Sequence, residues 1–195
     1  MTVRARFGFF LAPAVLLCLG AAFAQTEPPP RKQGMVELYF GRYDITDARF
    51  KSVYEAGGGI RGLFLSSALP FDLDLYAEIK EFHKTGRLTY TLEETTFFLL
   101  PLSLGIRYIL PGRVLMPYVG GGADFYFYYE SNPIAKTMNI VSGAHALAGI
   151  YIQPGRNWPI RLNGRIKYTR LLAREGEIDV QLGGLEYGAG LAIVF

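Results

Sequence analysis

The sequence contains almost no cysteine. Cys18 is the single cysteine among 195 residues, and it lies inside an N-terminal segment that has the pattern of an export signal. Leu17 precedes it at the position where a lipoprotein signal has a small residue, so we expect no lipid attachment. A chain that has lost this segment holds no disulfide and no thiolate metal site, which agrees with passage through an oxidising compartment.

Long apolar runs are also missing. The N-terminal segment has a basic start, a short apolar stretch interrupted by Pro13, and an Ala-x-Ala cleavage site at 22–24. Because a membrane-spanning helix needs about 20 apolar residues, this pattern predicts a cleaved signal peptide over 1–24. Residues 25–34 hold three consecutive prolines and predict a flexible lead. The folded domain is then expected over 35–195.

Charge of one sign is not in excess. The chain has 20 Lys and Arg against 17 Asp and Glu, and the predicted signal removes two arginines, which leaves a net charge of +1. Neither a basic nucleic-acid footprint nor an acidic tail is present. Together with export, this balance argues against nucleic acid as a partner.

Apolar and polar side chains alternate with a period of two from residue 35 onward, which predicts β-strands. In 71–80 every odd position is apolar, and the even positions carry four charges. The two faces of 160–169 separate in the same way. Weaker alternation predicts six further strands, at 36–43, 56–65, 98–108, 119–129, 144–152 and 185–195. An even number of strands lets an antiparallel sheet close into an up-and-down barrel without free edges.

The predicted connections alternate in length. The short ones contain proline or Pro-Gly turn signals and lie at 66–70, 110–116 and 153–159. The long ones lie at 44–55, 83–95, 130–140 and 170–183. Bacterial membrane barrels alternate short periplasmic turns with longer outward loops. We therefore expect both chain ends and three turns on the periplasmic side, and four loops on the cell surface.

The polar face of the predicted strands suits a narrow interior. It is rich in glycine, which weakens strands exposed to water, and it holds six acids and six bases. Because buried charges are tolerated when paired, we predict an all-β, eight-stranded antiparallel up-and-down transmembrane β-barrel with a lumenal charge network. The residues of this network are Glu37, Arg61, Asp72, Asp74, Glu78, Lys80, Arg107, Asp124, Arg161, Arg165, Lys167 and Glu186.

Aromatic residues make up 14% of the chain, as suits a membrane barrel whose Tyr and Trp gather at the two interfaces. The predicted interfacial residues are Tyr43, Tyr54, Tyr108, Tyr129, Trp158, Tyr168, Tyr187 and Phe195.

The last seven residues resemble the C-terminal assembly signal of bacterial outer-membrane proteins through Gly190, Ile193 and the terminal Phe195. Ala189 departs from the polar residue that the signal has at its position. With 98–108 and the Pro-Tyr-Val-Gly-Gly-Gly stretch that begins at Pro117, these residues make the chain resemble the small outer-membrane β-barrel family that includes the OmpA transmembrane domain, OmpX and OmpW. The resemblance implies a bacterial outer-membrane location, contact with membrane lipid and lipopolysaccharide, and insertion by the barrel-assembly machinery.

The sequence offers little for catalysis. His83 and His145 are the only histidines, and the His-x-Ser-Asn arrangement of lipid A deacylases does not follow His83. Ser142 lies near His145 in sequence, but the two side chains point to opposite faces of a strand. Isolated histidines without cysteine form no recognisable metal site. We predict no enzymatic activity, no cofactor and no metal.

Three functional hypotheses remain open. The leading one is a non-enzymatic barrel with an envelope-structural or surface-interaction role through its four extracellular loops, whose partner no motif names. The second is a narrow transporter for small apolar compounds, similar to OmpW, which requires an apolar pocket near the outer loops; Leu147 is the one bulky inward apolar residue identified for it. The third is a lipid A modifying enzyme, as some barrels of eight strands are.

Overall fold

A computed structural model describes residues 34–88, 93–133, 136–155, 158–175 and 178–195. The predicted signal peptide, and the predicted lead up to residue 33, lie outside the described residues. The strands are β1 (Gly34–Ile45), β2 (Gly58–Ala68), β3 (Leu73–Arg87), β4 (Glu94–Ile109), β5 (Leu115–Ser131), β6 (Lys136–Ile152), β7 (Ile160–Glu175), β8 (Ile178–Gln181) and β9 (Gly184–Val194), and the helix is α2 (Ala48–Tyr54). Within these ranges, no helix is both long and apolar enough to cross a membrane.

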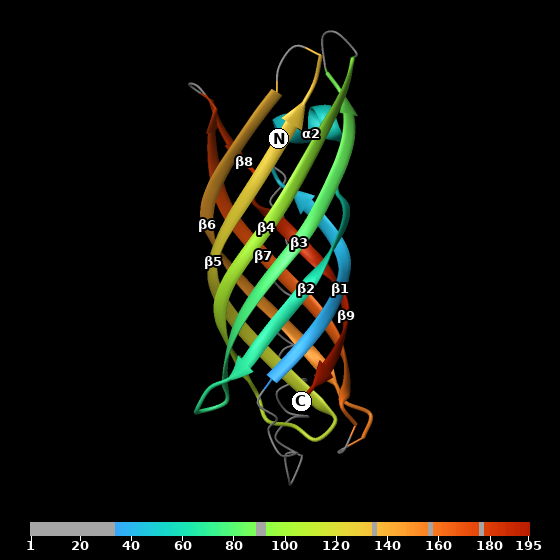
Figure 1. Ribbon diagram of the computed structural model, residues 1–195, viewed down its shortest axis with the longest axis vertical. Helices are drawn as coiled ribbons and strands as arrows, with labels where there is room; N and C mark the ends of the chain where they lie inside the picture. The colour runs from blue at the N-terminus through green and yellow to red at the C-terminus, as the bar shows by residue number, and fades with distance from the viewer. Residues whose placement is uncertain (1–33, 89–92, 134–135, 156–157, 176–177) are drawn as a thin grey trace, which may run out of the picture.

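Eight of the strands form a closed antiparallel barrel (Figure 1). Strands β1 to β7 pair in chain order, and β9 pairs with both β7 and β1. The short β8 instead forms a hairpin with the far end of β7. Gly34 and Phe195 exchange two backbone hydrogen bonds of 3.0 Å, so both ends of the barrel chain meet. The prediction of an eight-stranded up-and-down barrel is confirmed.

The two ends of the barrel differ. The turn end carries Gly34, Phe195 and the connecting residues 69–72, 110–114, 153–155 and 158–159. The loop end carries α2 and the β7–β8 hairpin, and Figure 1 shows α2 at the end opposite the C-terminus. The three predicted turns therefore lie together, as expected from the alternation of short and long connections.

The strands run further toward the loop end than predicted. β3 continues to Arg87, β5 to Ser131 and β7 to Glu175, so much of the predicted loops at 83–95, 130–140 and 170–183 is strand. Alternation of polarity marks only the part of a strand that faces lipid, whereas the backbone ladder continues beyond it. The predicted loop at 44–55 contains α2.

The wall is apolar outside and polar inside, as predicted. On β1, Leu38 and Phe40 are 53% and 62% exposed, whereas their neighbours Glu37 and Tyr39 are buried. Other large apolar side chains on the outer face are Leu75, Ile79, Leu104, Ile106, Val119, Ile140, Leu162, Leu191 and Ile193. So much contiguous apolar surface is unfavourable in water and favourable in lipid.

Side chains fill the lumen in layers. Near the loop end, the ring of Tyr43 contacts Phe82 at 5.6 Å and Tyr126 at 6.3 Å between ring centroids. Near the turn end, Met35, Met116 and other apolar residues form a second cluster. Charged side chains occupy the space between, which matches the expectation that eight strands leave room for side chains rather than for a water column.

Candidate functional site

A compact group of ion pairs crosses the middle of the lumen. Glu78 accepts hydrogen bonds from Arg165 at 2.5 Å and from Lys167 at 3.2 Å, and Lys80 lies 3.0 Å from the same carboxylate. Glu186 bridges Lys80 at 2.5 Å and Arg165 at 3.3 Å. These side chains are all at most 1% exposed. Strands β3, β7 and β9 are thus tied together across the barrel, and these five residues are called the ion-pair layer below.

The ion-pair layer continues into a polar chain on β4, β5 and β6. Lys167 donates to Asp124 at 3.0 Å and to the Ser103 hydroxyl at 2.7 Å. His145 Nδ1 lies 3.0 Å from the other Asp124 oxygen, and its Nε2 is hydrogen-bonded to the Tyr76 hydroxyl. Since the His145 side chain is fully buried, it acts as a hydrogen-bonding residue inside the lumen.

A second polar group lies toward the turn end. Arg107 pairs with Asp74 at 3.0 Å and donates to the Tyr151 hydroxyl at 2.6 Å. Tyr151 in turn donates to Glu37 at 2.6 Å, and the Asn163 amide donates to the other Glu37 oxygen at 2.7 Å. Glu37 is therefore held by neutral donors and linked to Arg107 through a tyrosine. Nothing in the sequence pattern assigned Tyr151 or Asn163 to this network.

The structure brings nine of the twelve predicted network residues into these two groups and leaves three outside. The prediction for Arg61 is wrong: its side chain is 68% exposed on the outer face, where it pairs with Glu81 at 3.1 Å. Ile60 takes the inward position on β2. The glycines around Arg61 give the two faces of β2 too little contrast in polarity to predict which face points inward.

The other two predicted residues lie nearer the turn end. Asp72 is half-buried in the turn before β3, with a φ of 58°. Arg161 is at the start of β7, and its Nε donates to the Gln153 side chain at 3.0 Å. Strand parity placed Asp72 within a strand, whereas β3 begins one residue later, at Leu73. Arg161 has the inward parity that was predicted, but it lies at the first positions of β7, away from both groups.

The three residues of the predicted assembly signal lie on β9 and just after it. A side chain at Gly190 would meet the Glu37 carboxylate inside the lumen. Ile193 and Phe195 are exposed on the outer face, Phe195 to 69%. Their role in assembly stays a prediction.

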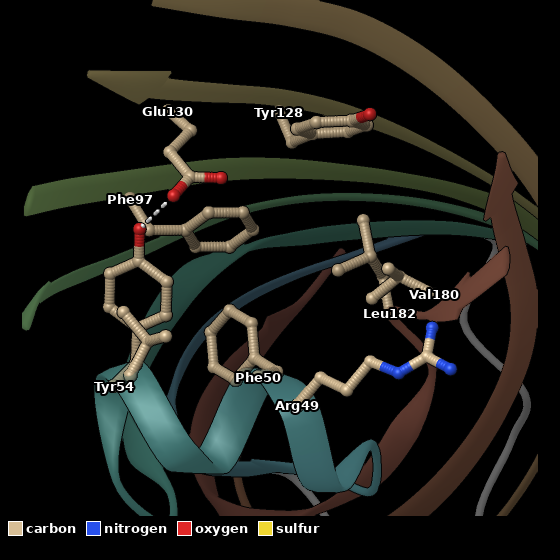
Figure 2. A pocket seen from close by; sticks show the side chains of 9 residues that line it. Arg49, Phe50, Tyr54, Phe97, Tyr128, Glu130, Val180 and Leu182 are labelled. Carbon is tan, nitrogen blue, oxygen red and sulfur yellow. Dashed lines mark hydrogen bonds between the residues drawn. The ribbon is translucent and has the colours of Figure 1, made fainter. Parts of the chain in front are cut away.

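A pocket of about 220 Å³ opens beneath α2 at the loop end. Figure 2 shows Phe50 and Tyr54 reaching from the helix toward Phe97 of β4 and Tyr128 of β5. Val180 and Leu182 close the opposite side, and Arg49 and Glu130 line the pocket as its charged residues. Tyr54 was predicted at the membrane interface, but its side chain is buried here; Tyr43 is likewise buried in the lumen. Both predictions are wrong.

The first anchor of α2 is at its start. Asp47 caps the helix by accepting from the backbone N–H groups of Arg49 at 2.8 Å and Phe50 at 3.4 Å. Its second oxygen accepts from the Gln181 N–H at 3.0 Å. Burial raises the pKa of Asp47, but these hydrogen bonds and the Arg49 charge outweigh burial, so the pKa lies below its ordinary value.

The second anchor of α2 is at its end. The Tyr54 hydroxyl donates to Glu130 at 2.7 Å and lies 3.0 Å from the Thr95 hydroxyl. Lys84 donates to the Tyr54 carbonyl at 2.7 Å. A short helix of seven residues is marginal on its own, so these contacts and the packing of its aromatic side chains hold it over the barrel mouth.

The pocket differs from the one sought in the sequence. Leu147, the residue identified there, is buried in the cluster near the turn end. The signal that was missed is the helical spacing of Phe50, Val53 and Tyr54 after a capping aspartate, which is a pattern of an amphipathic helix.

No family model matches the chain, and no curated protein matches it either. Among solved structures, the outer membrane protein OprG of Pseudomonas aeruginosa is similar with a TM-score of 0.65 at 12% identity, over 84% of this chain and 97% of that chain. Neisserial surface protein A gives a TM-score of 0.58 at 14% identity, over 83% and 97%.

The attachment invasion locus protein Ail of Yersinia pestis, solved with the heparin analogue sucrose octasulfate, gives a TM-score of 0.53 at 13% identity, over 84% of this chain and 99% of that chain. Identities this low show the fold alone. This chain has the fold of the small, eight-stranded bacterial outer-membrane β-barrels.

Proposed function

We propose that this protein is a non-enzymatic outer-membrane barrel that conducts no solute through its lumen and acts at the cell surface through its loop end. The observation that carries the proposal is the ion-pair layer, whose five charged side chains fill the middle of the lumen. Breaking one buried pair typically costs about 3–5 kcal/mol. Opening a water path requires several pairs to separate together, so a resting pore is unfavourable.

The apolar outer face supports the proposed location. It offers a continuous surface to lipid, and the loop end then faces lipopolysaccharide and the medium. We propose that the barrel-assembly machinery inserts the chain by recognising Gly190, Ile193 and Phe195. A non-enzymatic role fits the position of His145, which is sealed between Tyr76 and Asp124, whereas His83 faces outward from β3.

Single-channel recording in planar bilayers tests the closed lumen. We expect no current steps from the wild-type protein. The matched control is a barrel that carries both Glu78→Ala and Arg165→Ala, shown to be folded by its heat-dependent gel mobility; removal of two large side chains from the layer should give measurable steps. Steady steps from the wild-type protein would refute the proposal.

A second candidate, entry of small apolar compounds, is favoured by the pocket beneath α2. Below the pocket, however, stand the aromatic rings of Tyr43, Phe82 and Tyr126 and then the ion-pair layer, and the backbone ladder of the wall closes around the barrel. Uptake of a labelled aromatic hydrocarbon by cells with and without the protein separates the candidates. Equal rates support surface action, and a faster rate with the protein supports entry.

A further inference from the structure

We propose that the pocket beneath α2 is a binding site for small aromatic carboxylates, with Arg49 pairing with the carboxylate group. This inference rests on the proposed surface role of the loop end and names the class of ligand that the loop end binds. Three features of the pocket carry it: an aromatic lining, the exposed guanidinium of Arg49, and a small volume.

The lining suits an aromatic ring. Phe50 stacks on Tyr54 at 4.7 Å between centroids and meets Phe97 edge-on at 4.9 Å. Phe97 also stacks with Tyr128 at 6.2 Å. Aromatic pairs at these distances gain energy beyond the burial of their area, and an additional ring between α2 and β5 would extend the same packing. Val180 and Leu182 supply an aliphatic wall on the other side.

Arg49 supplies the charge. Its side chain is exposed at the pocket, and within the described ranges its guanidinium forms neither an ion pair nor a hydrogen bond. The Asp47 carboxylate, which its charge influences, is held by backbone N–H groups. A guanidinium can bind a carboxylate with two parallel hydrogen bonds.

The end of the pocket opposite Arg49 is unfavourable for a ligand carboxylate. Figure 2 shows Glu130 across the pocket from Arg49, bonded to the Tyr54 hydroxyl. A ligand carboxylate is repelled from Glu130 and attracted to Arg49, which sets one orientation: the acid group near Val180 and Leu182, and the ring against Phe50 and Phe97.

The volume limits the size of the ligand. About 220 Å³ is less than the ~300–1,000 Å³ of sites for drug-sized molecules. One aromatic ring with a short carboxylate arm, roughly ten non-hydrogen atoms, fits this space.

Calorimetric titration of the mature barrel in lipid nanodiscs tests the inference with three matched probes: hydrocinnamate, hydrocinnamyl alcohol and hydrocinnamyl amine. We expect hydrocinnamate to bind at least tenfold more tightly than the alcohol at neutral pH. Arg49→Gln should lower the affinity for hydrocinnamate to that for the alcohol and leave the affinity for the alcohol unchanged. Arg49→Glu should make the amine the preferred probe. Lys51→Gln, which removes a positive charge from the same helix away from the pocket, should leave the preference unchanged.

The outcomes separate this inference from the proposed function. Equal affinity for acid and alcohol, or a preference that survives Arg49→Gln, would overturn the ligand class. Binding of none of the probes would overturn the pocket as a site for aromatic ligands. Neither result depends on the closed lumen, which the bilayer recording tests by itself.

Discussion

Replacing Arg165 by glutamine removes the cation that joins Glu78 and Glu186 across the lumen. In the wild-type barrel its Nη2 lies 2.5 Å from Glu78 and 3.3 Å from Glu186. Its guanidinium also stands over the Tyr39 ring, 4.0 Å from the centroid. The variant keeps most of the side-chain volume but loses these charge interactions, while both carboxylates stay buried.

The expected loss follows from burial. Both carboxylates keep Lys80, and Glu78 also keeps Lys167, so the negative charge is only partly uncompensated. Removal of one partner of a buried pair costs about 3–5 kcal/mol, and a desolvated cation over a ring adds about 2 kcal/mol in favourable cases. Because Lys80 and Lys167 still compensate part of the negative charge, they offset an amount similar to the contribution of the ring, and we expect the free energy of unfolding to fall by about 3–5 kcal/mol.

Arg61→Gln is the matched control. Arg61 is also an arginine on a barrel strand, but its pair with Glu81 is exposed, and exposed pairs contribute about 0.2–1 kcal/mol. Reversible urea unfolding in lipid vesicles, followed by the fluorescence of the single tryptophan, Trp158, gives both values. If Arg165→Gln cost no more than Arg61→Gln, the ion-pair layer would not be the buried network described above.

The remaining predictions concern α2, β9 and the C-terminus. Because the pKa of Asp47 is lowered in the folded state, its contribution to docking of α2 is complete above the ordinary value of about 4. This contribution is lost as the pH falls through the lower folded value. The protection of the Gln181 amide against hydrogen exchange should fall there, and Asp47→Asn should remove that pH dependence. Gly190→Val should destabilise the barrel by about 1–3 kcal/mol, because a Cβ there meets the Glu37 carboxylate, while Ala189→Val on the outer face should change the unfolding free energy far less. Phe195→Ala should lower the amount of assembled barrel in cells severalfold while refolding into detergent still proceeds; unchanged amounts in cells would remove Phe195 from the assembly signal.

Much of the fold could be predicted because a membrane wall imposes a strict period of two. In 71–80 the alternation placed Asp74, Glu78 and Lys80 inside, where the structure has them. The same argument failed for Arg61, since glycines surround it and carry no polarity. Alternation also predicted an end of β3 that is too early, because the segment from His83 to Arg87 has no apolar face. The ladder with β4 nevertheless continues to Arg87.

The candidate site was harder to predict. The charges of the layer could be predicted from parity, but their partners could not, since Glu78 and Arg165 are far apart in sequence and meet only when the barrel closes. The helix could have been found from Asp47 and the spacing of Phe50 and Tyr54. The pocket could not be predicted, because it also needs Val180, which the β7–β8 hairpin brings to the mouth.

The accessibility of a thiol at Ser103 tests the closed lumen most directly. Ser103 is fully buried and bonded to Lys167 and Asp124, and the predicted mature chain has no cysteine. In sealed vesicles, a Ser103→Cys barrel should stay unlabelled by a small charged thiol reagent added on either side, while Ser52→Cys on the exposed face of α2 should react at once. Labelling of Ser103→Cys from either side, in a barrel that is still folded, would contradict a lumen closed by ion pairs.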